Sequence, residues 1–296
     1  MSTSNGIGVT GWAWKIAAIA VAYFLGTIIA GAVIAAAGMP WPAFPNPPDQ
    51  TTNLILGALS SALVAGCLAL LAWGVRGSQP VRWLVLAAFT YVIFGLNNQI
   101  EAAAFTAFGG TATMIVFFVA PCLLGSAAAA WLVRPGTALQ PRDVTVFDRP
   151  ASAWWWRLAV AWLAFPVIYV FFGMLVAPIV VPFYKDPSFG LTLPGWNTIL
   201  PVVLLRSALA LAVTLPVLLL WSRSRRALLV SLAIAFFAMM GLIGLAATTF
   251  FPPTLRVAHS IEILGDAVVY AWVLVALFVP RSAATASTTT APARVG

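Results

Sequence analysis

Eight apolar runs, each about twenty residues or longer, dominate this sequence. The runs are rich in Ala, Leu and Val and lack the short alternating pattern of membrane strands. They predict transmembrane helices near 14–38, 52–75, 82–107, 111–133, 156–182, 197–221, 227–250 and 256–280. The sequence therefore predicts an all-α integral membrane protein with eight transmembrane helices.

The low content of charged residues supports this class. Only 7% of the residues are charged and 62% are hydrophobic, whereas a soluble domain needs about a quarter of charged residues to cover its surface. The net charge of +8 comes from basic residues at the ends of the apolar runs, so we expect no nucleic-acid partner. Cys67 and Cys122 lie inside apolar runs and imply no disulfide framework.

The basic residues also predict an orientation. Twelve of the 15 fall on one side of the predicted membrane. They are Lys15, Arg76, Arg82, Arg134, Arg142, Arg149, Arg157, Arg223, Arg225, Arg226, Arg281 and Arg294. Lys185 and Arg256 lie on the opposite side, and Arg206 falls within a span. Since basic residues concentrate on the cytoplasmic side, we expect a plasma-membrane protein with both termini cytoplasmic.

The two halves of the chain resemble each other. Trp14-Lys15-Ile16-Ala17 matches Trp156-Arg157-Leu158-Ala159, and Gly31 matches Gly173 at the same separation. Four spans per half give both halves one orientation, so the sequence predicts two parallel four-helix repeats. The predicted organisation is a cytoplasmic segment 1–13, a first repeat 14–133, a cytoplasmic linker 134–155, a second repeat 156–280 and a disordered cytoplasmic tail 281–296.

Three acidic residues stand inside the apolar runs: Glu101, Glu262 and Asp266. An ionised carboxylate in hydrocarbon costs several kcal/mol, about 3 on insertion scales, so such residues usually face a cavity or a partner. Arg256, His259, Glu262 and Asp266 follow one another at steps of three and four residues, which places them on one face of a helix. We therefore expect this face to point into the bundle.

Counting residues from the span ends predicts the depth of each polar side chain. Glu101 and Glu262 should lie about 9–10 Å below the outer interface, at about 1.5 Å per residue. Asn97, Asn98, Asp266 and Arg206 should lie about 13–16 Å down. These depths predict an outward-facing pocket with two layers, in which Asp266 pairs with Arg206. The candidate substrate- or ion-binding residues are Glu101, Glu262, Asp266, Arg206, His259, Asn97 and Asn98.

The same residues also admit structural roles. An Arg206–Asp266 ion pair could lock two helices together, and His259 could be a hydrogen-bonded residue at the rim. Asn97 and Asn98 could bridge helices, each bond contributing about 0.5–2 kcal/mol. The chain has a single histidine and no phosphate-binding glycine loop, CxxC pair or HExxH motif, which excludes a multi-histidine haem or zinc site. Glu101, Glu262, Asp266 and an asparagine carbonyl could still bind a hard cation such as Mg²⁺ or Ca²⁺. We assign no metal and no cofactor.

Three functions remain open from the sequence. The first is a transporter or binding protein for a small solute or ion, in which Glu101 and Glu262 bind protons or cations. The second is an intramembrane enzyme on a lipid-type substrate, with a glutamate as general acid or base and His259 assisting. The third is a non-catalytic membrane scaffold subunit. Membrane lipid is the expected surrounding partner, and no oligomeric state is predicted.

Overall fold

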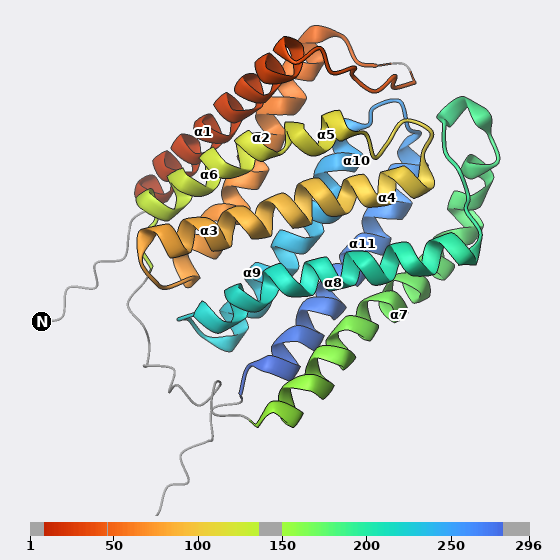
Figure 1. The fold of residues 1–296 in the computed structure, drawn as a ribbon. Helices are drawn as coiled ribbons and strands as arrows, with labels where there is room; N and C mark the ends of the chain where they lie inside the picture. Colours follow the sequence, from red (N-terminus) through yellow and green to blue (C-terminus); the bar gives the residue numbers. More distant parts are fainter. Residues whose placement is uncertain (1–8, 46, 136–149, 281–296) are drawn as a thin grey trace, which may run out of the picture.

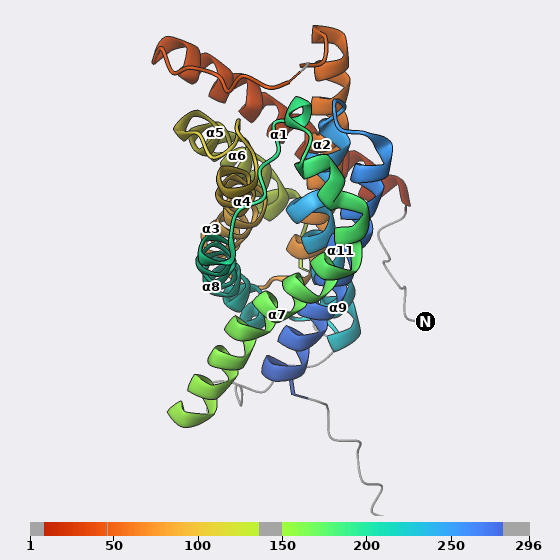
Figure 2. The same ribbon diagram turned by 90° about the vertical axis from the view of Figure 1, so that its right-hand side faces the viewer.

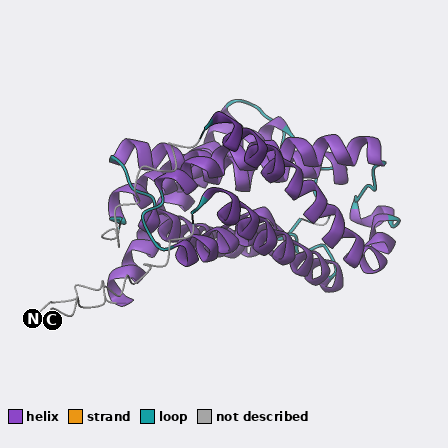
Figure 3. Cartoon of the chain, turned by 90° about the horizontal axis from the view of Figure 1, so that it is seen from below, coloured by secondary structure: helices purple, strands orange, loops and turns teal. Residues whose placement is uncertain are grey.

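The structure is a computed structural model that describes residues 9–45, 47–135 and 150–280. Within these ranges, eight helices are long and apolar enough to cross a membrane. The regular structure of the described residues is helical, apart from two isolated bridges (Figure 3). The predicted all-helical, multi-pass membrane class is confirmed.

The first four spans occupy the N-terminal half of the chain. The first two are α1 (Val9–Ala36) and α2 (Gln50–Gly74). The third span joins α3 (Gln79–Thr90), the π-helix η1 (Tyr91–Leu96) and α4 (Asn97–Phe105). The fourth joins α5 (Ala112–Phe117) and α6 (Val119–Leu132).

The last four spans follow residue 150. The fifth is α7 (Ala151–Tyr184), which is followed by the short 3₁₀ helix η3 (Pro187–Phe189). The sixth is α8 (Trp196–Leu220). The seventh joins α9 (Arg225–Phe237), the π-helix η4 (Ala238–Leu242) and α10 (Ile243–Ala247), and the eighth is α11 (Pro253–Phe278).

Local signals set several helix ends. The side chain of Asp49 accepts a hydrogen bond from the backbone N–H of Thr52 at 3.0 Å and caps α2. Gly38, at φ 63°, turns the chain after α1, a conformation that glycine adopts without strain. Pro253 starts α11, where the missing N–H would have had no helical partner.

Two helices are longer than expected. α1 and α7 begin at Val9 and Ala151 instead of at residues 14 and 156. Their first turns carry tryptophans that suit an interface, so the helices continue beyond the apolar windows. The predicted linker is shortened accordingly, and its residues 136–149 lie outside the described residues, as do residues 1–8 and the predicted tail 281–296.

The eight spans form a closed ring (Figures 1 and 2). Following the contacts around it, α1 packs on α6, α6 on α3, and α3 and α4 on α8. α8 then packs on α7, α7 on α11, α11 on α9, α9 and α10 on α2, and α2 on α1. Spans that are distant in the sequence are therefore neighbours around one interior.

One end of this ring is closed by backbone contacts. We call it the basic face, because the helix ends there carry Arg76, Arg82, Arg134, Arg157 and Arg223. The ends of α2 and α8 meet in an antiparallel bridge between Val75 and Trp221, and the N–H of Ser222 donates to the carbonyl of Gly74 at 2.8 Å. The Trp221 side chain is fully buried and packs directly on Gly74.

Arg82 reinforces the same end of the ring. Its guanidinium is buried and donates to the carbonyls of Val75, Ala72, Ala130 and Val133. These carbonyls belong to the C-terminal ends of α2 and α6, whose last carbonyls lack helical partners. One side chain thus ties three spans together at the basic face.

The opposite end is the loop face, formed by segments 37–45, 47–49, 106–111, 185–195 and 248–252. Two of these segments pair with each other: the N–H of Ala107 donates to Gly190 at 2.8 Å, and the N–H of Thr192 donates to Phe105 at 2.8 Å. These two hydrogen bonds join the two halves of the chain at the loop face.

Candidate functional site

A cavity of about 940 Å³ occupies the part of the ring nearer the loop face. Its walls come from α1, α2, the third and fourth spans, α7 and the last two spans. Glu101, Glu262, His259 and Asn98, four of the residues selected from the sequence, line it. Arg206, Asp266 and Asn97 are buried behind its lining.

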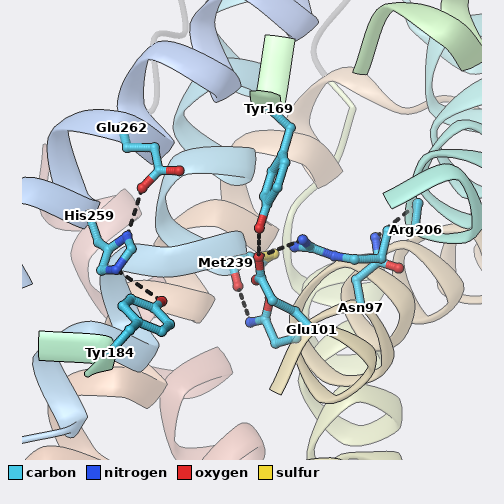
Figure 4. A network of polar contacts seen from close by, with 9 residues as sticks. Asn97, Glu101, Tyr169, Tyr184, Arg206, Met239, His259 and Glu262 are labelled. Carbon is cyan, nitrogen blue, oxygen red and sulfur yellow. Dashed lines mark hydrogen bonds and ion pairs between the residues drawn. The ribbon is translucent and has the colours of Figure 1, made fainter. Parts of the chain in front are cut away.

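Glu101, on α4, meets two partners from the second half of the chain (Figure 4). Its Oε1 accepts a 2.6 Å bond from the Arg206 guanidinium on α8 and a 3.1 Å bond from the Tyr169 hydroxyl on α7. The Arg206 side chain is 3% exposed and that of Glu101 is 28% exposed. The ion pair therefore has a desolvated cation and a carboxylate that still reaches the cavity.

Glu262, on α11, belongs to a separate chain of contacts (Figure 4). Its Oε2 lies 2.6 Å from Nδ1 of His259, whose Nε2 lies 3.3 Å from the Tyr184 hydroxyl. The donor in each contact depends on the imidazole tautomer. A carboxylate, an imidazole and a phenol are thus linked in a row along the cavity wall.

A glycine makes room for this carboxylate. A Cβ built on Gly173 of α7 would lie 3.2 Å from Oε1 of Glu262. One carboxylate oxygen therefore contacts His259, and the other faces Gly173 of α7, where a larger residue would crowd it.

The two asparagines join helices through backbone carbonyls. Asn97 donates to the carbonyl of Arg206 at 3.2 Å, and Asn98 donates to the carbonyl of Met239 at 2.8 Å. Met239 belongs to η4, and η1 and η4 are in contact. π-helical segments often occur at functional sites, and here both lie beside the polar residues.

The predicted Arg206–Asp266 pair is wrong, because Arg206 binds Glu101 instead. The backbone of Arg206 is level with Asn97, and Glu101 lies one helical turn from Asn97 toward the loop face. The long Arg206 side chain spans that turn, of about 5.4 Å. Asp266 is buried, and its Oδ1 has no hydrogen-bond partner within the described structure.

Three residues of the site were missed from the sequence: Tyr169, Gly173 and Tyr184. Together with the buried Val176 and Val180 they follow one another at steps of four, three, four and four on α7. This spacing is the stripe of one helix face. Tyr, Gly and Val do not stand out in an apolar helix, so the sequence held no signal that singles this stripe out.

No group of three or more His, Cys, Asp or Glu residues in the described part of the chain is placed to hold a metal ion. Comparison with protein families, with curated proteins and with solved structures finds no significant match. The function is therefore argued from the geometry of the site.

Proposed function

We propose that this protein binds and transports a small solute or ion through the carboxylate-lined cavity. The observation that carries the proposal is that Glu101 and Glu262, from different halves of the chain, line one cavity of about 940 Å³. A purely structural polar cluster needs no such space beside it. Glu101, Glu262, Asp266, Arg206, His259, Asn97 and Asn98 form the proposed binding site.

The charges of the site favour exchange with a proton or a cation. Three carboxylates, those of Glu101, Glu262 and Asp266, face one arginine and one histidine. Uncompensated carboxylates are costly at membrane depth, so protons or a bound cation must balance the remainder. Loading and release of that counter-charge is the chemistry that a coupled transporter needs.

The ring supports the proposed repeat and, with it, alternating access. The spans follow the order first, fourth, third, sixth, fifth, eighth, seventh and second. If each span is replaced by the span four later, counting on from the eighth to the first, the order around the ring is unchanged. A twofold axis along the membrane normal that relates the two halves would produce this order. Parallel repeats of this kind occur in transporters, where one half moves against the other around a central site.

The proposed orientation places both termini in the cytoplasm and the loop face outside the plasma membrane. The positions of the basic residues support it. In this orientation the cavity is on the outer side, and the Val75–Trp221 closure seals the cytoplasmic side. Transport would require that closure to open while the loop face closes.

Flux measurements in proteoliposomes test the proposal. Vesicles loaded with the pH-sensitive dye pyranine are energised by a potassium diffusion potential, and the rate of internal pH change is recorded. We expect wild-type protein to give a proton flux above that of protein-free vesicles. Glu101→Gln and Glu262→Gln should reduce it to the protein-free rate while the purified variants still elute as folded protein.

The same measurement separates the alternatives. Wild-type flux equal to that of protein-free vesicles would contradict proton-coupled transport. If both variants retain full flux, the carboxylates are not needed for transport and the polar residues are structural, as in a scaffold. The Glu262–His259–Tyr184 chain favours a second candidate, an intramembrane enzyme acting on a lipid-type substrate. It would convert such a substrate in detergent without any gradient, with Glu262 as general base.

A further inference from the structure

The size of the cavity indicates the kind of ligand it holds. A volume of about 940 Å³ is near the upper end of small-molecule sites, which span about 300–1,000 Å³. A proton or a bare inorganic ion needs a small part of this space. The rest of the volume suits an organic ligand. This inference rests on the transport function proposed above and specifies its solute.

The walls indicate an apolar ligand body. Eight phenylalanines and three tyrosines are among the lining residues. Phe108 contacts Phe44, Phe250 and Phe251 near the loop face, with ring centroids 5.4, 5.7 and 6.5 Å apart. Aromatic faces accept apolar groups and also attract organic cations, by about 0.5–2 kcal/mol for each ring.

The charges of the lining indicate a positive head. Of the described residues that line the cavity, none is Lys or Arg, whereas two are glutamates. Arg206 stands behind the lining and is bound to Glu101 at 2.6 Å. Among the described residues, Glu262 forms an ion pair only with the imidazole of His259, and Asp266, buried one turn further in, forms none.

The edge of the cavity indicates a route of entry. Ile28 on α1 and Leu54 on α2 line it, and each residue is 55% exposed. Both helices are apolar enough to span the membrane. These two exposed apolar residues mark the edge at which a hydrophobic molecule from the bilayer would meet the cavity.

From these observations we infer that the transported solute is a hydrophobic organic cation. Its apolar body lies among the phenylalanines near the loop face, and its positive group lies beside Glu262. Phosphate-bearing lipids are disfavoured, because their anionic head would meet glutamates and no free arginine or lysine within the described lining.

Two ions of the same shape and opposite charge test this inference. Protein in lipid nanodiscs is titrated with radiolabelled tetraphenylphosphonium, and binding is compared with that of tetraphenylborate after subtracting empty nanodiscs. We expect saturable binding of tetraphenylphosphonium alone. Glu262→Gln should weaken it about tenfold or more, because a charge partner in a desolvated site is removed.

Matched variants control for charge and folding. Asp186→Asn removes a carboxylate from the exposed loop after α7, outside the cavity lining, and should leave binding unchanged. Gly244 lines the cavity and has no atom within 4 Å of an added Cβ, so Gly244→Phe should fill the space and abolish binding. Gly31 has equal room but is not part of the lining, so Gly31→Phe should bind normally.

Equal binding of the two ions, no binding of tetraphenylphosphonium, or full binding by Glu262→Gln would each overturn the inferred ligand class. The proton-flux measurement then shows whether the proposed transport function fails together with the ligand class. If proton flux persists and disappears in Glu262→Gln, the transport function stands and only the ligand class is wrong. If both binding and flux are absent, both proposals fail.

Discussion

Glu101 and Glu262 line one cavity, yet each has its own set of partners. Glu101 accepts hydrogen bonds from Arg206 and Tyr169, and Glu262 contacts His259. The sequence could predict that both face the interior, because either would be costly in lipid. It could not predict the partners, since equal depth in a bundle does not fix which long side chain reaches which neighbour.

Gly173 offers a direct test of how Glu262 is positioned. In Gly173→Ala the new methyl group would press on the Glu262 carboxylate at 3.2 Å, while the other oxygen stays bound to His259. We expect the carboxylate to move by a few tenths of an ångström and the proton flux in proteoliposomes to fall several-fold. The stability of the purified protein, measured by thermal unfolding, should change by less than about 1 kcal/mol.

Gly31, the predicted repeat counterpart of Gly173, provides the control. No atom lies within 4 Å of a Cβ added there, so Gly31→Ala should gain about 0.4–1 kcal/mol through the unfolded state. Its flux should equal that of wild type. If Gly173→Ala also gains stability and keeps full flux, the contact between α7 and the Glu262 carboxylate has no functional role.

Among the helices, α7 and α11 form the pair that builds one wall of the site. α11 presents His259, Glu262 and Asp266, and α7 presents Tyr169 and Tyr184. The α11 stripe could be predicted because charged residues at helical spacing are conspicuous in an apolar run. The α7 stripe could not, because apolar residues also face lipid and its tyrosines carry no charge.

The π-helices η1 and η4 are a second feature that the sequence did not indicate. η1 ends immediately before Asn97 in the third span, and η4 in the seventh span contains Met239, whose carbonyl accepts from Asn98. A π-helical turn changes the backbone ladder without requiring a proline or a charged residue, so a hydropathy window detects nothing. The contact between them depends on the packing of the two halves.

The contact between Asp49 and Thr52 at the start of α2 stabilises the helix end in a pH-dependent way. Hydrogen bonds from the hydroxyl and the N–H of Thr52 lower the pKa of the exposed Asp49 carboxyl below its ordinary value. A lowered folded-state pKa means that this cap stabilises the helix end above the ordinary pKa, about 4, and is lost as pH falls through the lowered value. Hydrogen exchange of the Thr52 amide should therefore accelerate, beyond its intrinsic rate, when pH is lowered from about 5 to about 2.

Asp49→Asn separates the cap from its charge. Asparagine also caps helices but does not titrate, so the Thr52 amide in this variant should show protection that does not vary over the same pH range. The same pH dependence in Asp49→Asn would contradict the assignment to Asp49.

The number of spans could be predicted from the sequence, but their order around the ring could not. Eight apolar runs of sufficient length specify eight crossings. The order around the ring depends on which face of each helix meets protein, and lipid-facing and protein-facing residues are both apolar here: Val167 and Met174 are 69% and 66% exposed, whereas Ile19 and Phe165 are buried. The cavity follows from that order, so it too was visible only in the structure.

Transport through this site requires that the cavity admit water from outside the ring and expose its carboxylates to solute. Ser60→Cys places a thiol in the cavity lining, whereas the native Cys67 and Cys122 are buried. Ser231→Cys, which is 3% exposed and outside the lining, is the control. The measurement is the rate of labelling by a membrane-impermeant thiol reagent in right-side-out and inside-out vesicles. We predict rapid labelling of Ser60→Cys from the outside and slower labelling from the inside, as alternating access requires. Labelling no faster than that of Ser231→Cys from either side would show that water does not reach the cavity and that the proposed transport is wrong.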